Sequence, residues 1–286
     1  HNSLVSSAIL KNCSDMGIKS LVLLHGGAIP HLFNLEKFPN WNFNLMNNLK
    51  STNHFQVYSD EFKKRIIKNN KIEKFNNNII VLPYIKKNLD KKKISNKDLK
   101  IGYFCQTRFI NFLNYTRTGI NNEITLYKIR QKIFDKINSY NNIELNISSY
   151  GEKRENICSI SNFKNFKKKN AINFFHYDAK KLLENCDIFL FEQLSTVFIQ
   201  SLFLKRPTIL LKNEYYDFSK YFNEVDLEKN LFLSKSEDEI LKNIEIIFQN
   251  YEKNKSYLEH SHILSKYYDI DDNFKSYEIK ITELID

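Results

Sequence analysis

The sequence predicts an α/β protein with two Rossmann-like domains. Short β-rich runs alternate with helical stretches along the 286 residues, which is the pattern of parallel strands joined by helices. Some runs, such as 21–24 and 188–191, are continuously apolar, as strands covered on both faces are. A polar, lysine-rich stretch at 86–99 interrupts the alternation. We interpret that stretch as a linker between two domains.

The first block, residues 1–85, begins with a helix over 5–13, and Gly17 is the residue type that caps a helix C-terminus. Ser59 and Asp60 are expected to open a second helix, because Ser and Asp favour the N-cap. The expected strands of this block are 21–24, 55–58 and 79–82.

The second block, residues 100–255, repeats the alternation with more elements. Its expected strands are 100–105, 143–148, 172–175, 188–191 and 208–211, and its expected helices are 123–139, 179–185, 196–204 and 237–250. Further helices are expected at 251–267 and 274–285. We expect the last segment, 256–286, to pack back toward the first domain.

Net charge, cysteine spacing and the length of the apolar runs narrow the classes of function that the chain can have. The formal net charge is +10, and lysines gather at 63–68, 86–93 and 164–169. Such a surface attracts polyanions such as nucleic acid, anionic lipid or phosphorylated substrates, or it is simply a solvated basic face. The four cysteines are widely spaced without a C-x-x-C pair, which argues against a zinc knuckle or a disulfide framework and is typical of reduced thiols in the cytoplasm. The apolar runs are far shorter than the ~20 residues of a membrane span.

One segment carries most of the functional signal. The apolar run 188–191 ends in Glu192, and a short turn then delivers Ser195 and Thr196 to the start of a helix. A helix N-terminus has unpaired N–H groups and a partial positive charge, which suit a phosphate. The two hydroxyls add donors at the same place. Alternatively, Ser195 or Thr196 is simply an N-cap.

This segment resembles the donor-binding motif of the GT-B superfamily, especially bacterial surface-polysaccharide transferases and CDP-glycerol glycerophosphotransferase-like proteins. In those, a similar strand, Ser-Thr turn and helix precede a strand that begins with Lys-Pro, and KRPTI at 205–209 matches that strand. The resemblance implies that Ser195 and Thr196 contact the diphosphate of a nucleotide-sugar donor. It places Glu192 nearby, facing the phosphates, the sugar or the ribose.

Two further segments fit the same template, and a third departs from it. KSLVLLHGG at 19–27 looks like a strand and His-Gly element of the N-terminal domain, and 101–108 looks like the first strand of the C-terminal domain. The loop after that strand would bring Thr107 and Arg108 to the donor phosphates. The third segment, 143–151, takes the place of a strand followed by Lys-x-His-Pro but lacks that motif, so the resemblance does not specify the nucleotide.

His25 is the candidate general base. It ends an apolar run, and Gly26 and Gly27 would let an acceptor approach closely. Alternatively, His25 hydrogen-bonds the neighbouring loop. We expect no metal and no other cofactor, because no D-x-D motif follows a strand, and the acidic segment 269–272 is expected to be a solvated loop.

The leading hypothesis is a metal-independent glycosyltransferase of surface-polysaccharide biosynthesis. It would move a sugar or a polyol phosphate from a nucleotide-activated donor to a glycan or lipid-linked acceptor. Its place would be the cytoplasm, at the anionic inner face of the membrane. The alternatives are a nucleotide-sugar 2-epimerase and a non-catalytic GT-B module that binds a polyanion or a protein. Nucleic acid is not an expected partner, because Phe and Tyr mostly fall at core spacing. Since GT-B N-terminal domains usually carry more than three strands, residues 1–85 are expected to be an incomplete domain.

Overall fold

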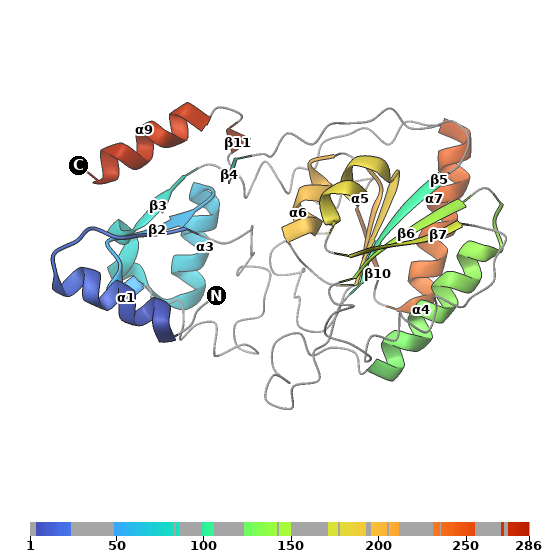
Figure 1. The fold of residues 1–286 in the computed structure, drawn as a ribbon, viewed down its shortest axis with the longest axis horizontal. Helices are drawn as coiled ribbons and strands as arrows, with labels where there is room; N and C mark the ends of the chain where they lie inside the picture. Colours follow the sequence, from blue (N-terminus) through green and yellow to red (C-terminus); the bar gives the residue numbers. More distant parts are fainter. Residues whose placement is uncertain are drawn as a thin grey trace. The chain divides into compact units, whose positions relative to one another are not determined.

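The chain divides into two compact units, and each has a sheet of its own. Unit 1 comprises His1–Lys87, Tyr215–Asp226 and His262–Asp286, and unit 2 comprises Asn88–Glu214 and Leu227–Ser261. The computed structural model describes residues 4–23, 49–82, 84–85, 99–105, 123–141, 143–149, 171–176, 178–192, 196–204, 206–211, 231–234, 236–254, 270–271 and 274–285. Figure 1 shows these parts of the chain as coloured ribbon.

Unit 1 is built around a parallel sheet with the order β1-β2-β3 among its described residues. A second parallel pair joins β4 to β11, so residues far apart in the chain meet in this unit. Its elements are α1 (Leu4–Asp15), β1 (Leu21–Val22), β2 (His54–Val57), α3 (Asp60–Asn70), the 3-10 helix η3 (Glu73–Asn78), β3 (Ile79–Val81), β4 (Tyr84–Ile85), β11 (Ile270–Asp271) and α9 (Phe274–Ile285).

The helix ends of unit 1 follow the local sequence. The α1 helix ends in a Schellman motif, in which Gly17 has a φ of 70° and the Ile18 N–H donates to the Cys13 carbonyl at 2.8 Å. Ser59 caps α3 by accepting from the Phe62 N–H at 3.1 Å, as its position before Asp60 predicts.

Unit 2 holds a parallel sheet with the order β10-β9-β8-β5-β6-β7 among the described residues. Numbered along this unit, the order is 3-2-1-4-5-6 read from β7 to β10, which is that of the Rossmann fold. The strands are β5 (Leu99–Phe104), β6 (Ile143–Ser149), β7 (Ala171–His176), β8 (Ile188–Phe191), β9 (Thr208–Leu211) and β10 (Leu231–Ser234). The helices are α4 (Glu123–Asn138), α5 (Ala179–Asn185), α6 (Thr196–Leu202) and α7 (Glu237–Asn254).

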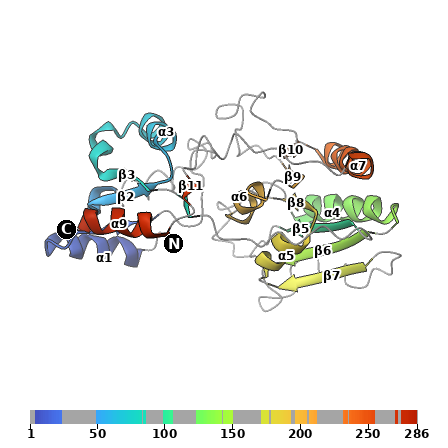
Figure 2. The same cartoon turned by 90° about the horizontal axis from the view of Figure 1, so that it is seen from above.

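Helices cover both faces of this sheet. Figures 1 and 2 show α4 and α7 on one face, and α5 and α6 on the other. Alternation along each strand separates the two faces. Ile101 and Tyr103 of β5 belong to the core shared with α4 and α7. Phe104 instead packs on Phe189 and Phe191, on the face of α5 and α6.

Some elements differ from the prediction. The expected strand 21–24 is shorter: β1 comprises Leu21–Val22, lies at the edge of the sheet among the described residues, and is followed by Leu23, which is 51% exposed. Within 269–272, expected to be a loop, Ile270 and Asp271 form β11. The α7 helix extends beyond residue 250 to Asn254 and takes in the start of the helix expected at 251–267. The structure also adds β10 and β4, which the sequence did not predict.

Gly102 lies where the sheet meets α5, and this close contact gives a testable prediction. A Cβ at this position would lie 3.2 Å from Cδ1 of Phe189 and 3.3 Å from Sγ of Cys186. We expect Gly102→Ala to lower the free energy of unfolding by about 1–3 kcal/mol through overpacking. Urea denaturation measures this. Adding Cys186→Ala removes the Sγ contact and should reduce the cost of Gly102→Ala, and strictly additive effects would show that Sγ contributes nothing to it.

Candidate functional site

The candidate site lies at the carboxyl edge of the unit 2 sheet, between β5 and β8. The strand order reverses at this point, and ligands of open α/β sheets bind beyond the carboxyl ends of the strands there. Phe104 and Phe191 are register partners at the ends of these two strands. The Glu192 N–H donates to the Phe104 carbonyl at 3.2 Å, so the described ends of β5 and β8 lie side by side. We call this place the switch point.

The start of α6 is part of the switch point. The helix begins at Thr196, as the sequence predicted, four residues after Glu192. This places the first turn of α6, whose N–H groups have no partner within the helix, close to the carboxyl end of β8. Ser195 lies outside the described residues.

Aromatic rings hold α6 against the strands. Phe191 stacks on Phe104 with ring centroids 4.4 Å apart and an interplanar angle of 5°. On α6, Phe198 meets Phe191 edge-on, at 5.5 Å and 87°. All three side chains are buried. Phe104 and Phe191, at the ends of β5 and β8, thus form with Phe198 the aromatic cluster on which α6 packs, which we call the seat of α6.

Glu192 belongs to a buried polar network on the opposite face of the sheet. Arg130 of α4 donates two hydrogen bonds to its carboxylate, from Nε to Oε1 at 2.7 Å and from Nη2 to Oε2 at 2.7 Å. The Tyr103 hydroxyl of β5 donates to Oε1 at 2.5 Å. The side chains of Arg130 and Glu192 are 0% and 1% exposed, so this ion pair is isolated from water.

Burial and the charge of Glu192 shift the pKa values of both Arg130 and Tyr103. Burial alone would lower the pKa of Arg130, but the Glu192 carboxylate more than offsets this and raises it. Burial, and then the negative charge of Glu192, raise the pKa of Tyr103 well above its ordinary value. Arg130 therefore stays charged, and Tyr103 stays protonated and donates its hydrogen bond.

These contacts change the interpretation of Glu192. We predicted that its carboxylate faces the donor, whereas both of its oxygens are engaged by Arg130 and Tyr103 on the α4 face. The geometry favours a role in positioning over direct contact with a ligand. Arg130 and Tyr103 were not singled out from the sequence. A signal existed, because Arg130 stands at helical spacing with Ile133 and Phe134, and a charge on an apolar helix face needs a partner.

The other predicted site residues are not described. His25, Gly26, Gly27, Thr107 and Arg108 lie outside the described residues, as does the predicted linker up to residue 98. Within the described part of the chain, no group of three or more His, Cys, Asp or Glu side chains could hold a metal ion. None of the described helices is long and apolar enough to cross a membrane.

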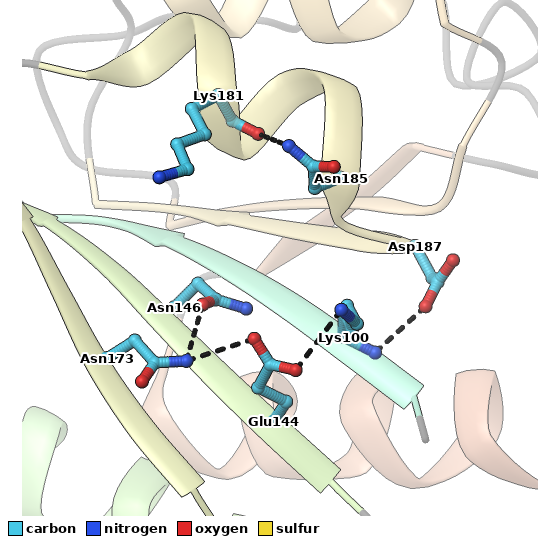
Figure 3. Close-up of polar contacts among 7 residues, drawn as sticks. All are labelled: Lys100, Glu144, Asn146, Asn173, Lys181, Asn185 and Asp187. Atoms are coloured by element: carbon cyan, nitrogen blue, oxygen red, sulfur yellow. Dashed lines mark hydrogen bonds and ion pairs between the residues drawn. The ribbon is translucent and has the colours of Figure 1, made fainter. Parts of the chain in front are cut away.

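A second polar network lies at the other edge of the same sheet (Figure 3). The Lys100 N–H donates to Asp187 at 2.8 Å, and Lys100 Nζ pairs with Glu144 at 3.2 Å. Asn173 then donates to Glu144 at 3.0 Å and to Asn146 at 3.1 Å. Lys100 and Glu144 lie near the amino ends of β5 and β6, so this network is remote from the switch point. Its contacts join neighbouring strands, and we assign it a structural role.

Asp187 of this network should give a pH-dependent stability. Burial raises the pKa of Asp187, outweighing the Lys100 N–H bond and nearby cations. A raised folded-state pKa stabilises the fold below the unfolded-state pKa, and this contribution is lost as pH rises through the folded-state pKa. We therefore expect Asp187→Asn, which keeps the acceptor oxygen, to be more stable than wild type at pH 7.

This gain should vanish as pH falls below about 4, the ordinary Asp value. Chemical denaturation between pH 3 and pH 7 measures it. Asp135→Asn, at an exposed position of α4, serves as the control. A stability difference for Asp187→Asn that is constant over this range would contradict the assignment.

Comparisons with known proteins find similarity in fold. No family model and no curated protein matches the chain. Among solved structures, TarM of S. aureus matches with a TM-score of 0.55 and 14% identity, over 94% of this chain and 51% of TarM. Anabaena HepE matches with a TM-score of 0.55 and 13% identity, over 98% of this chain and 75% of HepE. The chain has the GT-B fold.

This fold is not confined to transferases. A Listeria monocytogenes protein assigned as a UDP-N-acetylglucosamine 2-epimerase matches with a TM-score of 0.62 and 12% identity, over 98% of this chain and 76% of that protein. The chain spans about half the length of TarM. At these identities the similarity establishes the fold, and it confirms the fold class predicted from the sequence.

Proposed function

We propose that this chain is a nucleotide-sugar-dependent glycosyltransferase of surface-polysaccharide biosynthesis. The observation that carries the proposal is the Rossmann strand order of unit 2, which puts a switch point next to the start of α6 at Thr196. TarM and HepE, which share the fold, are both described in complex with UDP. The surface-polysaccharide assignment rests on the sequence resemblance at 183–211.

In this proposal the donor diphosphate binds at the start of α6. Ser195 and Thr196 donate hydrogen bonds from their hydroxyls and backbone N–H groups. Thr107 and Arg108, in the segment after β5, complete the phosphate site. As the bond to the sugar breaks, negative charge develops on the leaving nucleotide, and Arg108 and the helix start stabilise it without a metal ion.

The acceptor binds to unit 1 in the same proposal. His25 removes the proton of the attacking hydroxyl as general base, and Gly26 and Gly27 leave room for the acceptor. A lipid-linked acceptor would lie at an anionic membrane surface in the cytoplasm. The exposed lysines Lys64 and Lys68 of α3 are suited to such a surface.

A second candidate function is supported by the fold match to the 2-epimerase. An epimerase would alter the sugar of the donor with no acceptor present. A non-catalytic module, the third alternative, would bind without turnover.

Donor and acceptor assays separate these functions. The full chain is incubated with UDP-, CDP- and GDP-activated donors, with and without glycan or lipid-linked acceptors and with and without EDTA. We expect nucleotide release that needs the acceptor, survives EDTA and is lost in Ser195→Ala/Thr196→Ala. Conversion of the donor sugar without an acceptor would favour the epimerase. The absence of turnover together with nucleotide binding would favour the non-catalytic module.

A further inference from the structure

We propose that Arg130 is a positioning residue for the donor site, and that it acts through Glu192 to set the affinity for a nucleoside diphosphate. This inference rests on the proposed function. It deepens that proposal by assigning a role to a residue that the sequence motif does not contain.

Arg130 and Glu192 lie in parts of the chain that are next in sequence to the two segments following β5 and β8. Arg130 lies on α4, the helix that follows segment 106–122 after β5. Glu192 follows β8 and precedes residues 193–195, which lead into α6. The ion pair therefore ties α4 to the end of β8, and these two elements are next in sequence to segments 106–122 and 193–195. Because Tyr103 of β5 binds the same carboxylate, one buried group holds β5, β8 and α4.

The negative charge of Glu192 also links Arg130 to the donor site. Glu192 lies only four residues before Thr196, and a free carboxylate there would repel an anionic diphosphate. The guanidinium of Arg130 neutralises it and holds both oxygens on the α4 face, opposite the face of α6. A lysine carries the same charge but lacks the planar fork that binds both oxygens at once.

Arg206 provides a matched control within the same unit. It is also a buried arginine, but it precedes β9 at the amino edge of the sheet. Its Nη1 donates to the carbonyls of Leu183 and Cys186. Replacing Arg206 should therefore cost stability without changing the donor site.

The test uses the full chain, with UDP, CDP and GDP as probes. Isothermal titration calorimetry gives the Kd of whichever nucleotide binds the wild type. Hydrogen exchange gives the protection of the α6 amides in the absence of ligand. The variants are Arg130→Lys, Arg130→Met, Arg130→Met/Glu192→Gln and the control Arg206→Lys. Arg130→Lys and Arg130→Met/Glu192→Gln are included because neither leaves an unpaired buried charge, which could unfold the protein.

We expect Arg130→Lys to weaken nucleotide binding about tenfold and to speed exchange of the α6 amides, since small displacements of a binding group are costly. Arg206→Lys should leave both quantities unchanged. Arg130→Met/Glu192→Gln should bind more tightly than Arg130→Met, because the repelling charge is gone.

Three results would count against the inference. Unchanged nucleotide affinity in all the Arg130 variants would overturn it. So would an equal loss of affinity in Arg206→Lys, since the effect would then reflect stability alone. If the wild type binds no nucleotide, the proposed function fails, and the link from Arg130 to donor affinity fails with it. In that case, α6 exchange still decides separately whether Arg130 positions this helix.

Discussion

Replacement of Arg130 by Met is expected to lower the free energy of unfolding by about 3–5 kcal/mol, the usual cost of breaking a buried ion pair from one side. The reason is the environment of Glu192, whose side chain is 1% exposed and would lose the buried guanidinium that binds both of its oxygens. A loss of this size is a large part of the stability of a typical domain. Urea denaturation followed by circular dichroism measures it.

A variant that removes the whole polar network is the control for this prediction. Arg130→Met/Glu192→Leu/Tyr103→Phe removes both charges and the hydroxyl of this network together. We expect this triple variant to recover most of the lost stability, because apolar replacements of buried pairs are often neutral or stabilising. A cost below about 1 kcal/mol for Arg130→Met alone would show that Glu192 is solvated, contrary to the structure.

Truncation of Phe191 to Ala should have an effect of similar size. Its ring is 1% exposed and lies between Phe104 of β5 and Phe198 of α6. Removing a buried phenylalanine ring costs about 3–5 kcal/mol through lost burial and the cavity it leaves. Because this ring also seats α6, the α6 amides should exchange faster and nucleotide binding should weaken. Denaturation, hydrogen exchange and calorimetry measure the three effects.

Two variants isolate the role of this ring. Phe191→Leu keeps most of the volume and should cost less than the alanine variant. Phe248→Ala removes a buried ring of α7, which packs edge-on against Tyr140 at 4.5 Å. It should lower stability without selective loosening of α6. Equal exchange of the α6 amides in Phe191→Ala and Phe248→Ala would argue against a specific seat.

Much of the unit 2 fold could be predicted because its signals are local. The strand Ile188–Phe191 is continuously apolar, and the helix before it and the strand after it also have their predicted bounds. In unit 1, β4 and β11 were missed, because they have two residues each and are defined by their pairing with one another rather than by a local pattern.

In the candidate site, the start of the helix could be predicted from the local sequence, whereas the buried polar network could not. The start of α6 at Thr196 follows from an apolar strand, a turn and a helical pattern in adjacent residues. The network beneath it joins Glu192 to residues 62 and 89 positions earlier in the chain, Arg130 and Tyr103. No local pattern specifies such pairs, because they depend on the strand order and on the rotation of α4 about its axis. The predicted contact of Glu192 with the donor was drawn from its place in the motif alone.

The most direct test of the central claim is whether a nucleoside diphosphate binds at the switch point. The full chain is melted with UDP, CDP and GDP in wild type, in Ser195→Ala/Thr196→Ala and in the control Ser236→Ala. Ser236 accepts from the Glu239 N–H at 3.3 Å in the first turn of α7, after β10 at the far end of the same sheet. A ligand that binds only the folded state raises the Tm.

The proposed site predicts that one nucleotide stabilises the wild type and Ser236→Ala alike, but does not stabilise the double variant. Stabilisation of all three proteins, or of none, would contradict a donor site at the start of α6.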